Sequence, residues 1–124
     1  MPKEAVDRWT TADANELYEI PSWGKGYFSV SPEGNMLVHP TKDPAKSIDM
    51  KELVERLQAR GLDLPVLVRF NGILKNRLKE IHDAFAQSIR EHDYKGLYTC
   101  VYPIKVNQQR HVVEKILEYS RPYG

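Results

Sequence analysis

The strongest constraint on the fold is a pair of apolar, strand-length runs, each followed at once by the pattern of an amphipathic helix. The runs are residues 65–70 and 97–104, and helical spacing of apolar residues follows over 73–92 and again from Val112. Continuous apolar runs of this length are typical of strands that are covered on both faces. Two successive βα units predict two parallel, adjacent strands with a right-handed crossover.

Residues 1–62 have a different pattern and form the first of two predicted segments, the second being 63–124. Two short β runs, 27–30 and 36–38, flank the turn-forming sequence Ser-Pro-Glu-Gly-Asn. Turn residues between two β runs predict a hairpin. This hairpin is expected to lie apart from the two βα units.

Two helices are also expected in the first segment. Small polar residues that can cap them stand before each pattern: Thr10, Thr11, Ser47 and Asp49. The first helix is expected to stop at Pro21, because proline lacks the N–H group that a helix interior requires. The second is expected to end before Gly61, a residue type that favours the position just after a helix.

Composition excludes several classes of protein. The 124 residues carry a net charge of +1, with neither sign gathered into long runs, so no nucleic-acid footprint is expected. The single cysteine excludes an internal disulfide and fits a reducing compartment. No apolar run approaches the roughly 18–20 residues of a membrane span, and residues 1–13 lack the apolar core of a signal peptide. A cytoplasmic protein is expected.

Lys105 ends the second apolar run, where parallel α/β folds place their ligands. Side chains alternate along a strand, so one face carries the odd-numbered residues that include Val101 and Lys105. The other face carries the even-numbered ones: Tyr98, Cys100, Tyr102 and Ile104. We expect this larger set to pack against helices, with Cys100 as a small core hydrophobe and not a nucleophile.

The Lys105 amine has two interpretations at this stage. An exposed lysine has a pKa near ~10.4 and is a poor nucleophile, whereas a lysine in a low-dielectric mouth is more often neutral and condenses with an aldehyde. A lysine that simply ends a strand in solvent is the commoner case. Arg69 ends the first run in the same way, and either an anionic group or a structural ion pair is a suitable partner for it.

Five groups of motifs are spread from about Trp9 to Gly124. They are Leu17-Tyr18, Trp23-Gly24 with Gly26-Tyr27-Phe28, Leu64-Pro65 with Arg69-Phe70 and Ile73-Leu74, Tyr102-Pro103-Ile104-Lys105-Val106-Asn107-Gln108-Gln109 and Arg121-Pro122-Tyr123-Gly124. Together they resemble the amino-terminal region of biosynthetic arginine decarboxylases, which use pyridoxal phosphate on an alanine-racemase-like barrel. The string around Lys105 is the most specific part of the resemblance.

The resemblance implies an α/β fold that is the amino-terminal part of a (β/α)8 barrel, preceded by the hairpin segment. It implies that pyridoxal phosphate is the cofactor and that Lys105 is both the catalytic and the cofactor-binding residue. The implied reaction is the conversion of L-arginine to agmatine and carbon dioxide in polyamine synthesis. It further implies magnesium dependence, without an assignable metal ligand here, and homo-oligomers of the full-length enzymes, with no nucleic-acid or membrane partner.

Length limits that expectation, because a (β/α)8 barrel alone needs about 250 residues. The barrel is therefore expected to be incomplete in this chain, with uncovered strand edges that promote association and no activity of the chain alone. Two alternatives stay open: a fragment of another pyridoxal-phosphate barrel enzyme, such as a basic amino acid decarboxylase or a racemase, and a non-catalytic interaction fragment.

Overall fold

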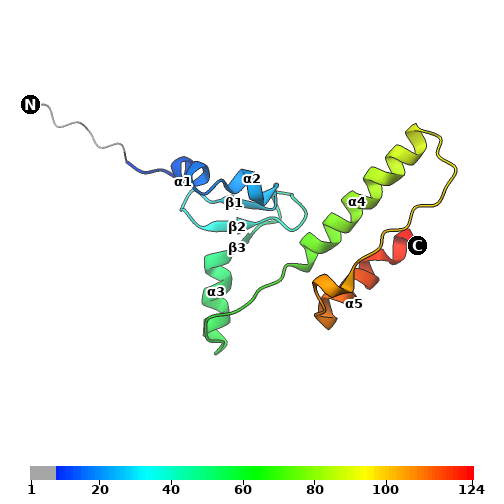
Figure 1. The fold of residues 1–124 in the computed structure, drawn as a ribbon. Helices are drawn as coiled ribbons and strands as arrows, with labels where there is room; N and C mark the ends of the chain where they lie inside the picture. Colours follow the sequence, from blue (N-terminus) through cyan, green and yellow to red (C-terminus); the bar gives the residue numbers. More distant parts are fainter. Residues whose placement is uncertain (1–7) are drawn as a thin grey trace, which may run out of the picture. The chain divides into compact units, whose positions relative to one another are not determined.

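A computed structural model describes residues 8–124, and the chain divides into two compact units, Met1–Val68 and Arg69–Gly124 (Figure 1). We call these the amino-terminal unit and the carboxyl-terminal unit. The first holds a small sheet with three helices, and the second holds two longer helices joined by an extended segment. The division falls after Val68, whereas the sequence pattern placed it after residue 62.

The amino-terminal unit begins with two short helices, α1 (Thr11–Leu17) and α2 (Ile20–Gly24). Thr10 caps α1: its hydroxyl accepts the N–H of Asp13 at 3.3 Å, and the Asp13 carboxylate accepts the N–H of Thr10 at 2.6 Å. Pro21 does not end a helix as expected, because it lies in the first turn of α2. The missing N–H of proline needs no partner there, so the residue is compatible with a helix start.

The predicted hairpin is confirmed as β1 (Phe28–Val30) and β2 (Met36–Val38), which pair antiparallel. Its turn is closed by the N–H of Ser31, which donates to the Asn35 carbonyl at 2.8 Å. Gly34 has a φ of +88°, a conformation that L side chains rarely adopt. A third strand, β3 (Ile48–Asp49), pairs antiparallel with β2 and was not predicted.

Three apolar side chains form the fully buried core of the amino-terminal unit, and no described residue of 69–124 is buried to the same degree. They are Ile20, Tyr27 and Val38, with exposed fractions of 2%, 5% and 0%. Ile20 begins α2, Tyr27 precedes β1 and Val38 ends β2, so α2 packs against the hairpin. His39 is buried beside them, and its Nε2 lies 2.7 Å from the hydroxyl of Ser29.

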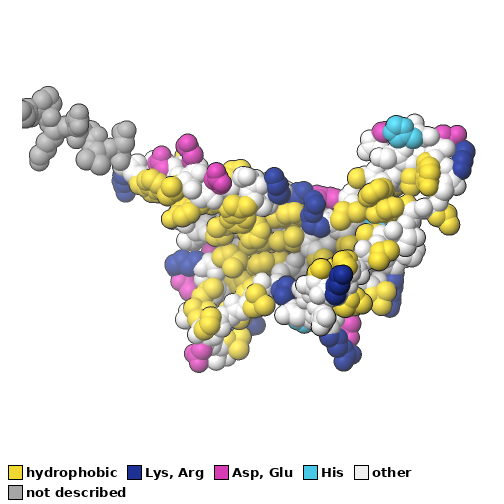
Figure 2. Space-filling view, viewed as in Figure 1, with side chains coloured by type: hydrophobic (Ala, Val, Ile, Leu, Met, Phe, Trp, Pro, Cys, Tyr) yellow, Lys and Arg dark blue, Asp and Glu magenta, His cyan; other side chains and the backbone are white. Residues whose placement is uncertain are grey.

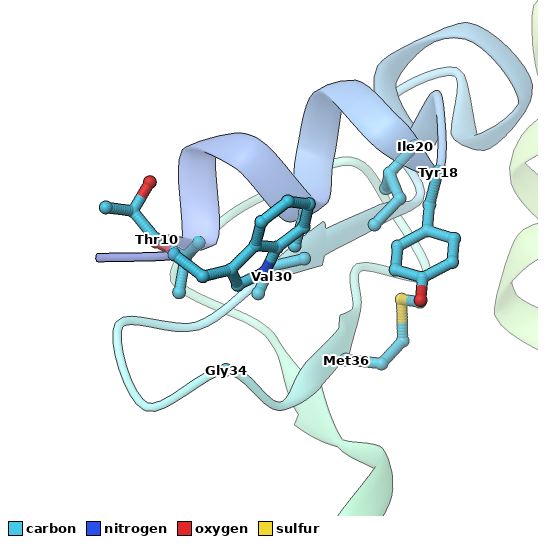
Figure 3. Close-up of a pocket in the computed structure, with 9 residues that line it drawn as sticks. Thr10, Tyr18, Ile20, Val30, Gly34 and Met36 are labelled. Carbon is cyan, nitrogen blue, oxygen red and sulfur yellow. The ribbon is translucent and has the colours of Figure 1, made fainter. Parts of the chain in front are cut away.

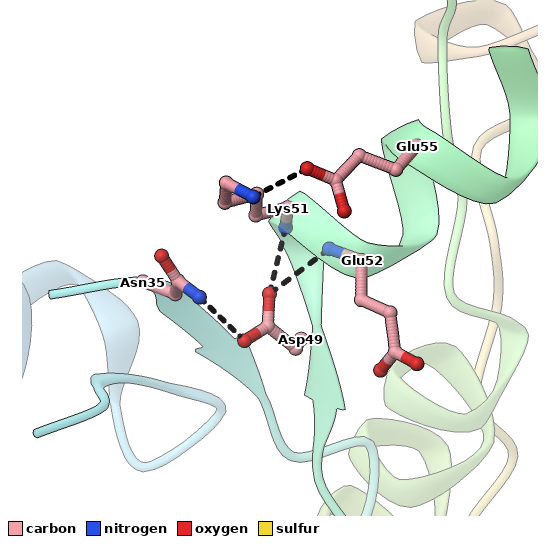
Figure 4. A network of polar contacts seen from close by, with 5 residues as sticks. All are labelled: Asn35, Asp49, Lys51, Glu52 and Glu55. Atoms are coloured by element: carbon pink, nitrogen blue, oxygen red, sulfur yellow. Dashed lines mark hydrogen bonds and ion pairs between the residues drawn. The ribbon is translucent and has the colours of Figure 1, made fainter. Parts of the chain in front are cut away.

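Helix α3 (Met50–Ala59) follows β3 directly, and Asp49 serves both elements (Figure 4). One carboxylate oxygen of Asp49 accepts the N–H groups of Lys51 and Glu52 at 2.8 and 3.1 Å, which confirms Asp49 as the helix cap. The other oxygen accepts the side-chain amide of Asn35 at 2.8 Å. The cap is therefore fastened to the hairpin turn.

The carboxyl-terminal unit consists of α4 (Asn71–Glu91) and α5 (Arg110–Ser120), with single 3-10 turns at Ile104–Val106 and Arg121–Tyr123. Both helices match the predicted helical patterns. The contacts between these two segments follow the same order along both of them: Arg69 with Gln109, then Lys75 with Tyr119, then His82 with Tyr123. The two helices therefore run in the same direction, as helices of successive βα units do (Figure 1).

The two predicted strands are not formed. Residues 65–70 and 97–103 carry no regular secondary structure, and the one described sheet contains β1, β2 and β3. Apolar content favours a strand, but a strand also needs a neighbour for its N–H and C=O groups. The mixed helix and strand content is that of a partial α/β fold, and the direction of α4 and α5 is the part of the βα prediction that these contacts support.

The even-numbered face of residues 97–104, expected to pack against helices, is covered only in part: Ile104 is 53% exposed. Tyr98 and Tyr102 are half-buried, whereas Leu97 and Val101 are 97% and 80% exposed. Cys100, expected in the core, is an exposed free thiol because nothing in the described chain covers this part of the run.

The described helices also include none that is long and apolar enough to cross a membrane.

Candidate functional site

Lys105 lies at the centre of a single 3-10 turn and is exposed. Two backbone hydrogen bonds of 3.1 Å form this turn, from Val106 N–H to the Pro103 carbonyl and from Asn107 N–H to the Ile104 carbonyl. The chain therefore changes from an extended run to a tight turn at the lysine. The sequence placed Lys105 at this junction, although as the end of a strand.

The residues after the lysine connect this turn to α5. The Asn107 side-chain oxygen accepts the N–H of Gln109 at 3.1 Å, which is an Asx-type turn. The Gln109 carbonyl then accepts the first helical N–H groups of α5, from Val112 and Val113. We call residues 103–109 the Lys105 turn. It is a continuous hydrogen-bonded path from the lysine to the start of a helix.

Arg69 is the second polar residue of the site. Its guanidinium Nη2 donates to the side-chain oxygen of Gln109 at 2.6 Å, although the two residues are 40 positions apart. Sequence reasoning offered an anionic group or an ion pair for Arg69 and did not find the glutamine. The available signal was position, since Arg69 and Gln109 each stand just before the start of a helix.

The Lys105 amine makes no hydrogen bond, ion pair or ring contact within residues 8–124. Most other described lysines are engaged, as in the ion pairs of Lys51 with Glu55 and Lys79 with Asp83. Attaching an aldehyde such as pyridoxal phosphate requires an uncommitted amine. Lys105 meets that requirement, and so does the equally exposed Lys25, so the described residues are compatible with attachment of the group but do not by themselves single out Lys105 for it.

A cluster of aromatic rings packs the far ends of the same two helices. His82 stacks on Tyr123 with ring centroids 4.2 Å apart, and Phe85 stacks on Tyr98 at 4.1 Å. Burial, and secondarily a hydrogen bond with Cys100, raises the pKa of Tyr98 above its usual value. His82 is thus a packing residue, and no group of three or more potential metal-ligating side chains occurs among the described residues.

The amino-terminal unit has a pocket of its own, about 420 Å³ in volume, under α1 and beside the hairpin (Figure 3). Tyr18 and Met36 point toward one another at one end of it (Figure 3). The lining is largely apolar: Trp9, Thr10, Thr11, Ala14, Tyr18, Ile20, Val30, Gly34 and Met36. Its lining contains no charged side chain.

Comparison with known proteins connects the Lys105 turn to an enzyme family. No family model matches the chain. A biosynthetic arginine decarboxylase of Rhodopirellula baltica is 56% identical over 117 residues, which is 94% of this chain and 18% of that protein. Similarly named proteins of Gloeobacter violaceus and a Synechocystis species are 46% and 43% identical over 93% and 94% of the chain. The chain is homologous to the amino-terminal part of biosynthetic arginine decarboxylases.

The homology with arginine decarboxylases confirms the resemblance found in the sequence. The chain spans about 18% of the length of the arginine decarboxylases that it matches. Both units take part in the likeness, because the match covers more than nine-tenths of this chain. The Lys105 turn and Arg69 therefore belong to a stretch with counterparts in much longer enzymes.

Proposed function

We propose that this chain forms the lysine-bearing part of an arginine decarboxylase, which converts L-arginine to agmatine and carbon dioxide in polyamine synthesis. The observation that carries the proposal is the uncommitted Lys105 amine, at the start of α5, in a chain homologous to proteins with that name. The names of these relatives favour decarboxylation over the racemase alternative.

In the proposed enzyme, Lys105 would hold pyridoxal phosphate through its Nζ atom. When bound, this group supplies an electron sink for the pair left at the substrate α-carbon when carbon dioxide departs. The contribution of this chain is the amine itself, held on a short turn beside a helix start. Once protonated, the same Nζ is the group of this chain that returns a proton to the α-carbon.

The proposal extends to the setting of the enzyme. We place the Lys105 turn at the mouth of an alanine-racemase-like barrel, supported by the shared direction of α4 and α5. The free thiol of Cys100 supports a reducing, cytoplasmic compartment. Homo-oligomers of the longer enzyme and magnesium dependence remain part of the proposal, and no magnesium ligand is assigned within residues 8–124.

The decisive experiment is a chimera in which this chain replaces the matching stretch of the Rhodopirellula baltica relative. We expect the chimera to release carbon dioxide from L-arginine, measured with carboxyl-labelled substrate. Lys105→Ala should abolish release, and Lys105→Arg should not restore it, because a guanidinium stays protonated and cannot condense with an aldehyde.

The matched control is Lys25→Ala, since Lys25 is also exposed and without a partner in the described chain. This change should leave carbon dioxide release as it was. Borohydride treatment of the cofactor-loaded chimera, followed by peptide mapping, should place the cofactor on Lys105. Turnover by the Lys105→Ala chimera, or cofactor on another lysine, would end the assignment. The 124-residue chain alone should release no carbon dioxide.

A further inference from the structure

The Arg69–Gln109 hydrogen bond joins the starts of two helices. Arg69 stands one residue before Phe70, which is the cap residue of α4, whereas Gln109 is itself the cap residue of α5. The 2.6 Å bond therefore links two junctions that are 40 residues apart in the sequence. Both residues belong to the carboxyl-terminal unit, so the link lies within one compact body.

Gln109 is also the end of the hydrogen-bonded path that begins at Lys105. Its N–H donates to the Asn107 side chain, and the N–H of Asn107 donates to the Ile104 carbonyl. These bonds are local to the Lys105 turn. The bond from Arg69 is different, because it fastens the turn to a distant part of the chain.

The chemistry of the pair suits a fixed support. The guanidinium of Arg69 carries its charge at every accessible pH and presents rigidly arranged donors, and the Gln109 amide oxygen accepts without adding a charge. A charged donor also forms a stronger hydrogen bond than a neutral one. We propose that Arg69 is a positioning residue, which holds the Lys105 turn in place through Gln109.

The support matters because a lysine side chain is long and rotates freely. If its backbone also moves, the amine samples a large volume and reaches any one position rarely. Fixing the Lys105 turn against the start of α4 removes the backbone part of that freedom. The catalytic consequence rests on the proposed function, whereas the mechanical consequence belongs to this chain alone.

The mechanical consequence is tested on the 124-residue chain by ¹⁵N relaxation. Arg69→Met keeps most of the side-chain length and removes the donors, and Gln109→Met removes the acceptor. We expect either change to lower the backbone order parameters of residues 105–108 from about 0.85 to below about 0.6. The double variant should lower them no further than each single one. Gln109→Glu, which keeps an acceptor, should retain the original values.

Arg77→Met is the matched control, because Arg77 is an exposed arginine of α4 that pairs with Glu80 and not with the Lys105 turn. It should leave the order parameters of residues 105–108 unchanged. Unchanged signals from the middle turns of α4 and α5 in every variant will show that the carboxyl-terminal unit is still folded. Equal order parameters in Arg69→Met and the original chain would overturn the proposal.

The catalytic consequence is tested in the chimera with the Rhodopirellula baltica relative. Arg69→Met should lower kcat about tenfold with KM for L-arginine changed less than twofold, and the control Arg77→Met should stay within twofold of the original kcat. If the relaxation result holds but kcat is unchanged, Arg69 is not a positioning residue for the reaction. If the unmodified chimera is inactive, the proposed function fails, and the relaxation experiment still decides the Arg69 support.

Discussion

The two units differ in how much of their own apolar surface they cover. The amino-terminal unit closes a small core, in which Val38 of β2 is completely buried. Residues 69–124 have no side chain buried to that degree, and Leu97 and Val101 are almost entirely exposed. Figure 2 shows apolar side chains on the surface of the chain. Helices that have no sheet to pack against leave apolar side chains exposed to solvent.

Hydrogen bonding follows the same division. In the amino-terminal unit the β runs pair with one another, so the backbone groups of β2 have a strand on both sides and those of β1 and β3 have a strand on one side. In the carboxyl-terminal unit the apolar run before Lys105 has no strand beside it among the described residues. The β runs of the first unit therefore have strand partners, and the apolar run of the second has none among the described residues.

The largest effect on the free energy of unfolding is expected when a buried core side chain of the amino-terminal unit is truncated. Val38→Ala should destabilise the amino-terminal unit by about 2–3 kcal/mol, because two methyl groups are lost and a cavity remains in a site that cannot collapse easily. Urea unfolding followed by signals from β1 and β2 measures this. The matched change Val101→Ala, at an 80% exposed position, should cost less than about 0.5 kcal/mol. Equal costs would break the comparison between the units.

A smaller effect is expected at the link between the hairpin turn and α3. The Asn35 side-chain amide, with the N–H groups of Glu52 and Lys51, holds the pKa of Asp49 below its ordinary value. Asp49→Ala should lower the melting temperature of the amino-terminal unit by about 5 °C. Asp49→Asn should cost less, because the amide oxygen still caps the helix. Calorimetry of the three proteins measures both changes.

The sign of the pH dependence follows from the direction of that shift. The folded pKa of Asp49 is lower than its unfolded pKa, which is about 3.9. The ionised carboxylate therefore stabilises the fold at pH values above the unfolded pKa, and this contribution is lost as the pH falls through the folded pKa. Melting temperatures measured from pH 6 down to pH 2 should fall more in the original chain than in Asp49→Asn. Parallel profiles would show that Asp49 does not contribute to the acid sensitivity.

The smallest effect on stability is expected at the open run, where the readout is association. Leu97→Lys and Val101→Lys should leave the melting temperature nearly unchanged, since both side chains already lie in water. They should reduce self-association of the chain, because an uncovered apolar run with unpaired backbone is a template for another chain. Sedimentation at several concentrations measures this. A monodisperse original chain would contradict the view of the second unit as an open layer.

Sequence patterns predicted the elements whose causes are local. Asp49 was found as a cap because the signal lies within three residues of it, and α4 because its apolar spacing persists over many turns. Pro21 was misplaced because a proline is compatible with both an end and a first turn. The strand β3 was missed because two residues carry too little pattern.

Long-range features were harder to predict. The strand-like run before Lys105 has the right composition, but its hydrogen bonds depend on a neighbour that residues 97–104 do not specify. Its alternation was predicted correctly in part, since Tyr98 and Tyr102 are the half-buried side chains. Lys105 was identified from a specific motif, whereas its support by Arg69 through Gln109 spans 40 residues and has no local signature.

The unpaired run also determines where the chain is open to cutting. Proteases bind their substrates as extended segments with free backbone groups, and residues 97–103 offer such a segment just after Lys95. Lys95 is a site for trypsin outside regular structure, whereas Lys105 and the lysines within α3 and α4 are held in helical turns. A brief digestion will therefore separate α4 from α5 before it opens either helix, and any partner that covers this run will slow that cleavage.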